Sequence, residues 1–83
     1  MDSYNYLVES LHLNREIEFA FNGKLYFAEP DTNPPLERKY SIWNVETHTC
    51  IFSGSIEEML NYTFEGKYSL NSNYNMFDIL FIY

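Results

Sequence analysis

Histidine and cysteine side chains could bind a metal or carry out nucleophilic catalysis, and this chain of 83 residues has two His and one Cys. His48 and Cys50 are two residues apart, so they share one face if the segment is a strand. A zinc site usually needs a second close pair of ligands, and His12 alone does not supply one. Neither a glycine nor a helix start stands beside Cys50 to activate its thiolate. We therefore expect no metal and no catalytic thiol.

Carboxylates occur in two close pairs. Glu16 and Glu18 share one face of a predicted strand, and Glu57 and Glu58 lie in the first turn of a predicted helix, where the helix dipole favours negative charge. Acid–base catalysis of the glycosidase type needs one buried carboxylic acid in a cleft, and no pattern marks one. The pairs are therefore either solvated faces or parts of an acidic binding surface.

The charge of the chain limits its partners. Five Lys and Arg stand against twelve Asp and Glu, for a net charge of −7, which opposes direct binding to nucleic acid. Acidic side chains on a small rigid sheet can instead imitate a phosphate backbone and occupy the basic groove of a nucleic-acid enzyme. The sequence has three glycines and neither common phosphate-binding motif, so we expect no nucleotide cofactor.

Composition favours a folded domain. Hydrophobic residues make up 46% of the chain and aromatic residues 19%, which argues against disorder, and the length favours one domain over residues 1–83. No apolar run approaches the roughly 18–20 residues that span a bilayer. Residues 1–5 lack the features of a secretory signal, so we expect a cytoplasmic location and no membrane partner. Eight Tyr exceed the needs of a small core and favour an exposed binding surface.

The first part of the chain predicts a helix and then a hairpin. Ser3 can cap a helix that runs to about Leu13 and ends at Asn14, with apolar residues 4, 7, 8 and 11 on one face. Residues 16–21 alternate between polar and apolar, and the Asn22-Gly23 pair that follows is typical of a hairpin turn before a return strand over 24–29.

The register of this hairpin has two alternatives. A two-residue turn would pair Phe19 with Tyr26 and leave Leu25 and Phe27 on the outer face. A three-residue turn with a glycine bulge would pair Phe19 with Leu25 and Ile17 with Phe27. The second arrangement gathers four large apolar side chains on one face, so we expect it.

The middle of the chain predicts two more strands and a helix. Residues 30–35 contain three prolines and predict a loop. A third strand follows over Arg38 to Val45, with apolar residues on both faces as in a central strand, and a fourth runs over Thr49 to Ser53. Ser55 and Glu58 then match a capping box.

The capping box predicts a helix from Ile56 to about Phe64, with Gly66 as its C-terminal cap and a loop over 70–75. The segment Phe64-Glu65-Gly66-Lys67 also echoes Phe21-Asn22-Gly23-Lys24. We interpret this echo as a reused turn rather than a duplicated unit, because repeat architectures need about three units.

The last segment, Met76 to Tyr83, is apolar at nearly every position and predicts a strand that is either central in the sheet or paired with another chain. The element order αββββαβ indicates an α+β fold, a single small domain with a mainly antiparallel sheet of about five strands and two short helices. The expected core consists of Ile17, Phe19, Leu25, Phe27, Ile42, Ile56, Leu60, Ile79 and Phe81.

Residues 15–26, Arg-Glu-Ile-Glu-Phe-Ala-Phe-Asn-Gly-Lys-Leu-Tyr, resemble a loose group of small, largely uncharacterised proteins of low-GC Gram-positive bacteria and their phages. These proteins tend to open with a short helix, followed by an Arg-Glu-Ile-Glu-Phe hairpin with Asn-Gly-Lys at its turn. The resemblance covers about a dozen residues and supplies no catalytic residue. It implies a phage or mobile-element context, in which small acidic proteins, such as inhibitors of CRISPR nucleases, bind and block a host protein.

Together these features predict a non-enzymatic protein-binding module that inhibits a host defence or nucleic-acid enzyme, in the manner of an anti-CRISPR protein, through an acidic, Tyr-rich surface. The alternative is a self-assembling structural or accessory domain that forms a homodimer through the strand Met76–Tyr83. The expected protein-binding residues are Glu16, Glu18, Glu57, Glu58, Glu65 and Tyr68.

Overall fold

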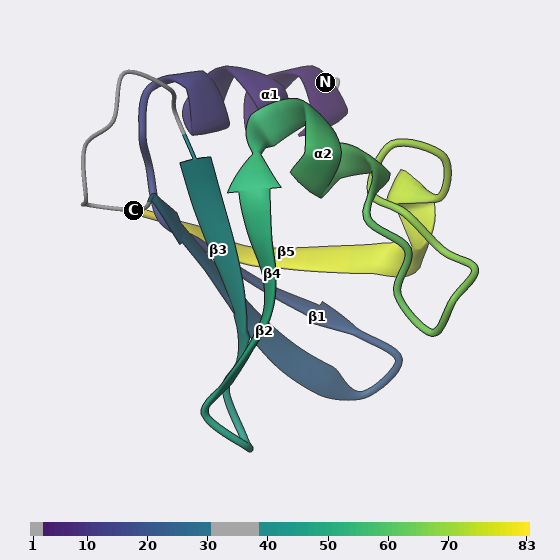
Figure 1. Ribbon diagram of the computed structural model, residues 1–83. Coiled ribbons are helices and arrows are strands. Elements are labelled where there is room, and N and C mark those ends of the chain that lie inside the picture. The colour runs from purple at the N-terminus through teal and green to yellow at the C-terminus, as the bar shows by residue number, and fades with distance from the viewer. Residues whose placement is uncertain (1–2, 31–38) are drawn as a thin grey trace.

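The computed structural model describes residues 3–30 and 39–83 and confirms the α+β fold, with elements in the expected order (Figure 1). The loop expected over 30–35 lies, apart from Pro30, outside the described residues. The elements are α1 (Ser3–His12), β1 (Ile17–Phe21), β2 (Lys24–Pro30), β3 (Lys39–Asn44), β4 (Thr49–Ser55), α2 (Ile56–Asn61), the short 3-10 helix η1 (Tyr74–Met76) and β5 (Phe77–Ile82).

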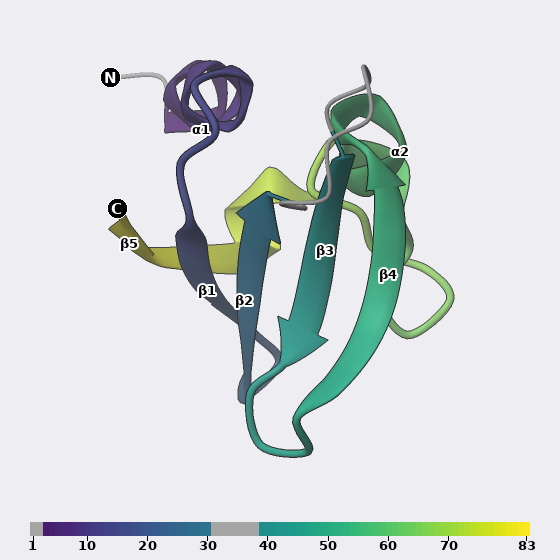
Figure 2. The ribbon, with the colours of Figure 1, turned by 60° about the vertical axis from the view of Figure 1, so that its left-hand side comes forward.

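The five strands form one antiparallel sheet in the order β4-β3-β2-β1-β5. Both helices lie on the same side of this sheet (Figure 2), and apolar residues of α1 and α2 join the inward side chains of the strands in one core. No other described helix or strand covers the second side, which we call the open face. None of the three described helices has the length and hydrophobicity of a membrane span.

The hairpin β1–β2 has a two-residue turn, so the expected three-residue register is wrong. Asn22 has a φ of 51° and Gly23 a φ of 77°. A type I′ turn requires two successive residues in this left-handed region, and its twist matches that of the strands it joins. Phe19 consequently pairs with Tyr26.

This register sends Leu25 and Phe27 to the open face, where both are half-buried, instead of into the core. Their places on the inner face are taken by Tyr26 and Ala28, which are buried. Phe81 also departs from the expected core: it pairs with Glu18 on the open face and is 58% exposed. The expected core residues that are buried are Ile17, Phe19, Ile42, Ile56 and Leu60, with Ile79 packed against them.

β5 is an edge strand, so the first of its two expected alternatives, a central position in the sheet, is wrong, and pairing with another chain remains the alternative. The third strand, β3, is central as expected, between β2 and β4. The buried Tyr40 of β3 ties α1 to the sheet, because its hydroxyl lies 2.9 Å from the carbonyl oxygens of both Leu11 and Arg15 and can donate to them. Asn14 has a φ of 61°, which confirms it as the left-handed residue that ends α1.

The helix α2 begins with the expected capping box and is shorter than expected, because it ends at Asn61 with Tyr62 as its C-terminal cap. Gly66 therefore does not cap it. Instead Glu65 and Gly66, with φ of 56° and 71°, form a turn of the same hand as Asn22-Gly23, as the sequence echo predicts.

We expect Phe19→Ala to reduce the free energy of unfolding by about 3–5 kcal/mol, because the Phe19 side chain is 1% exposed and its removal leaves a cavity in the core. Phe81→Ala should change it by no more than about 0.5 kcal/mol, because this ring is largely in water. Urea unfolding of both variants measures the difference. Equal losses would contradict the observed division between core and open face.

Candidate functional site

A single row of side chains crosses the open face over all five strands. Phe81 of β5 lies opposite Glu18 of β1, which lies opposite Phe27 of β2; Phe27 in turn faces Trp43 of β3, and Trp43 faces Cys50 of β4. Directly opposite residues in antiparallel strands share a face and lie close enough to contact one another. The row thus places one carboxylate among three aromatic rings on the side of the sheet that the helices leave uncovered.

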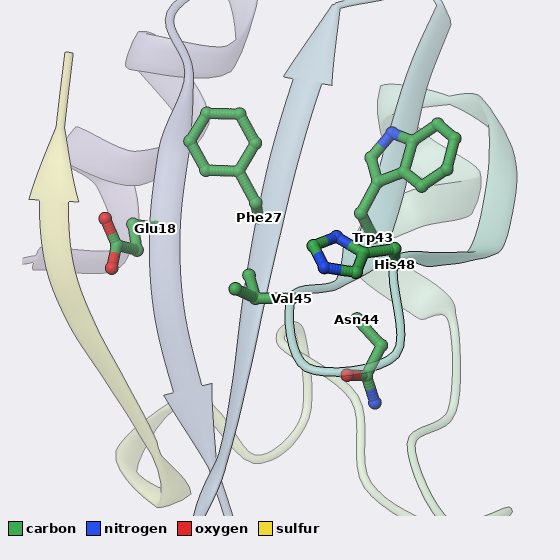
Figure 3. Close-up of a pocket in the computed structure, with 6 residues that line it drawn as sticks. All are labelled: Glu18, Phe27, Trp43, Asn44, Val45 and His48. Atoms are coloured by element: carbon green, nitrogen blue, oxygen red, sulfur yellow. The ribbon is translucent and has the colours of Figure 1, made fainter.

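The row borders a shallow hollow of about 420 Å³ (Figure 3). Its lining comes from β1, β2, β3 and the turn between β3 and β4. That turn is held by the Asn44 side chain, whose Oδ1 accepts hydrogen bonds from two backbone N–H groups of the turn, at 3.0 and 3.2 Å. The residues that line the hollow are Glu18, Phe27, Trp43, Asn44, Val45 and His48.

Tyr83 extends the aromatic surface beyond the row. Its hydroxyl donates to Glu18 Oε1 at 3.0 Å, and its ring lies 6.3 Å from that of Phe27 and 6.0 Å, stacked, from that of Phe81. The hydrogen bond to Glu18 raises the pKa of Tyr83, because it stabilises the protonated phenol. We call Phe27, Trp43, Phe81 and Tyr83 the aromatic band; Glu18 lies within it.

Of the expected site residues, Glu16 and Glu18 lie beside the aromatic band. Glu18 is half-buried on the open face, whereas Glu16 is exposed just before β1, and its carbonyl accepts the backbone N–H of Tyr83 at 2.8 Å. This pair is the part of the expected acidic surface that the fold brings into contact with exposed aromatic rings.

Glu65 and Tyr68 lie together at a different place, beside the hairpin turn. Glu65 Oε2 accepts a hydrogen bond from Asn22 Nδ2 at 2.7 Å, which joins the two left-handed turns, and the Tyr68 ring packs 5.6 Å from that of Phe21. A second hollow, of about 340 Å³, is lined by these four residues and Met76. Glu65 thus has a structural partner within the fold.

Glu57 and Glu58 lie at a third place, the exposed first turn of α2. Glu58 Oε1 accepts the backbone N–H of Ser55 at 2.9 Å, while the Ser55 hydroxyl accepts the backbone N–H of Glu58 at 3.0 Å. The hydrogen bonds from Ser55 lower the pKa of Glu58. Glu58 is therefore engaged in holding the start of its helix.

The aromatic band is the part of the surface that sequence reasoning missed as a site. The expected core includes Phe27 and Phe81, and the sequence pattern does not single out Trp43 or Tyr83 as binding residues. The two-residue alternative for the hairpin predicts part of this surface, because it leaves Phe27 beside Glu18 on the outer face.

Metal-ligating residues do not gather in the described part of the chain: no three His, Cys, Asp or Glu side chains lie close enough together to hold an ion. Cys50 is exposed, and its thiol donates to the Phe52 carbonyl at 3.3 Å. His48 occupies the turn before β4 with a φ of 55°.

Comparisons of the chain with protein-family models, with curated proteins and with solved structures find no match.

We expect the stability of the protein to fall as the pH drops through the lowered pKa of Glu58, below its ordinary value of 4.5, because folding favours the ionised carboxylate. In Glu58→Gln the neutral side chain can still accept the Ser55 N–H, so the helix cap should stay in place. The variant should lose only the part of the stability that depends on the ionisation of Glu58. Thermal unfolding of both proteins across the acid range measures it.

The matched control is Glu57→Gln, which removes the same charge from the same turn outside the capping box. This control should retain the acid-dependent loss of stability seen in the wild-type protein. A Glu58→Gln protein that keeps the full wild-type pH dependence would contradict the assignment.

Proposed function

We propose that this protein is a non-enzymatic protein-binding module that docks a basic partner on the open face of its sheet. The observation that carries the proposal is the row in which Glu18 lies between Phe81 and Phe27, with Trp43 beyond, on a face left uncovered by the helices. Large aromatic side chains supply much of the energy at protein interfaces, and neighbouring exposed apolar side chains on a small domain are typical of docking sites.

The charge of the open face favours a cationic partner. Asp78 lies opposite Ala20 on this face and is exposed, so it adds a second carboxylate to that of Glu18. Glu16, directly before β1, and Glu29, near the end of β2, lie at the same end of these two neighbouring antiparallel strands. The positive charge of Lys39, at the start of β3, contributes to lowering the pKa of Glu58 in α2.

Arginine is the side chain that suits this combination best. Its guanidinium can stack on an aromatic ring and at the same time be attracted to the negative charge of a nearby carboxylate. Long-range attraction by a chain of net charge −7 would also speed the encounter with a basic surface. The basic groove of a nucleic-acid enzyme is such a surface, so the proposed activity is inhibition of a host defence or nucleic-acid enzyme by occupation of that groove.

His48 lines the hollow on the open face together with Glu18 and Trp43 (Figure 3). A side chain of a docked partner could enter this hollow and contact all three residues.

Trp43 is the one tryptophan of the chain, so its fluorescence reports on the open face. We expect an arginine-rich peptide to change this fluorescence saturably, with an affinity about tenfold lower for Glu18→Lys and a steep weakening with added salt. Glu57→Lys, which makes the same charge change on α2, should bind as the wild type does or only slightly less. Equal loss in both variants would contradict a site on the open face.

Affinity capture from a lysate of a low-GC Gram-positive bacterium then tests the biological partner. The wild-type protein and Glu57→Lys should retain the same basic protein at low salt, and Glu18→Lys and Phe81→Ser should not. Inhibition of the captured enzyme in the same rank order completes the test. A partner retained equally by all four proteins would contradict docking through the aromatic band.

A further inference from the structure

The outer edge of β5 is the least protected edge of this sheet. Among the described strands β5 pairs with β1 on one side only. The described residues include six exposed large apolar side chains, and four of them lie in β5 or directly beside it: Met76, Leu80, Phe81 and Tyr83, with exposed fractions of 50%, 44%, 58% and 60%.

The opposite edge of the sheet has a different character. β4 has no lysine, proline or charged residue, but its exposed side chains are small (Thr49, Cys50 and Ser53), and it leads directly into α2. β5, with the sequence Phe-Asp-Ile-Leu-Phe-Ile, exposes the large apolar side chains of Leu80 and Phe81 beside the carboxylate of Asp78. Soluble proteins usually protect edge strands with lysine, proline or a covering segment, because unpaired backbone N–H and C=O groups are a template for another strand.

We propose that a second copy of this chain covers the β5 edge, so that two sheets join through antiparallel β5 strands about a two-fold axis. Such an interface is self-complementary, because each strand is both the template and its occupant. The proposal does not depend on the docking of a basic partner, which uses the open face instead of the edge.

The arrangement of side chains along β5 allows this pairing with like faces together. Ile79 and Ile82 both face the core side, and Asp78 and Tyr83 both belong to the open face. A two-fold register that sets Ile79 opposite Ile82 of the second copy also sets Asp78 opposite Tyr83. In β5, Phe81 pairs with Glu18 and Ile79 pairs with Phe19, so Leu80 between them is an extra, unpaired residue. In this register Leu80 lies near the two-fold axis in both copies.

The same register keeps the acidic groups apart. The two Asp78 residues are five positions apart along the paired strands, which is roughly 16 Å at the rise of a β-strand. This separation exceeds the Debye length of about 8 Å at physiological ionic strength, so their repulsion is largely screened. The pairing would also set Phe81 opposite Leu80 of the second copy, one position from the Phe81 of that copy, and so extend the aromatic band across the axis.

Sedimentation equilibrium and light scattering over a wide concentration range test the proposal. We expect a reversible monomer–dimer equilibrium for the wild-type protein and a monomer for Leu80→Lys, because a charge at this exposed edge position opposes strand pairing. Ser53→Lys, which places the same charge at the β4 edge, should dimerise as the wild type does. Circular dichroism confirms that each variant is folded.

Salt separates this proposal from docking of a basic partner. Two chains of net charge −7 repel each other, so added salt should strengthen the dimer, whereas it should weaken binding of an arginine-rich peptide. A wild-type protein that stays monomeric at every concentration and salt would overturn the proposal, as would a dimer that survives Leu80→Lys or is lost in Ser53→Lys. Peptide binding through Glu18 could persist in each of those cases.

Discussion

The two-residue turn at Asn22-Gly23 determines which side chains of the sheet reach the core. Both residues adopt left-handed conformations, which gives the hairpin the twist of its strands and fixes Phe19 opposite Tyr26. β3 pairs with β2 and β5 pairs with β1, so the faces of these outer strands follow from the register of the hairpin. A slip of one residue would exchange the two faces of a strand, moving Phe27 inward and Tyr26 outward. The core and the aromatic band therefore depend on the same turn.

The core on the inner side is completed by a segment that is neither helix nor strand. Phe64 follows α2, and its ring lies between 4.9 and 5.9 Å from five other aromatic rings, in edge-on or tilted arrangements. Aromatic rings bury large areas, which a small domain needs because it shields little of its surface on folding. The Glu65-Gly66 turn holds Phe64 in this position, and the hydrogen bond from Asn22 to Glu65 links that turn to the hairpin. The rings around Phe64 are those of Phe19, Phe21, Tyr26, Tyr62 and Phe77.

Features set by a few neighbouring residues could be predicted from the sequence, and features set by distant packing could not. The capping box of Ser55 and Glu58 and the left-handed Asn14 depend only on local backbone chemistry, and both are present. The expected register is wrong because it considers only contacts within the hairpin, where it gathers four apolar side chains on one face. In the structure Tyr26 packs instead against Phe64, a residue nearly forty positions away, which the hairpin alone does not reveal.

The candidate site was predictable to a smaller extent, for the same reason. Charge and spacing alone indicate Glu16 and Glu18, whereas their association with Phe81 and Tyr83 depends on β5 lying beside β1. The hydrophobicity of β5 suggested a strand with neighbours on both sides. Its position at the edge follows from the strand order, which pairs the last strand with the first and so cannot be derived from hydrophobicity alone.

The proposed docking depends on the position of Glu18 as well as on its charge. Exposed aromatic residues favour aggregation, and a net charge of −7 opposes it by mutual repulsion wherever the carboxylates lie. Solubility alone therefore does not require a carboxylate in the middle of the aromatic row. Glu18 is half-buried there between Phe81 and Phe27 and accepts the hydroxyl of Tyr83. A charge partly shielded from water acts on an approaching cation more strongly than one in bulk solvent, so in the proposed docking Glu18 would attract a cation more strongly than a fully exposed carboxylate would.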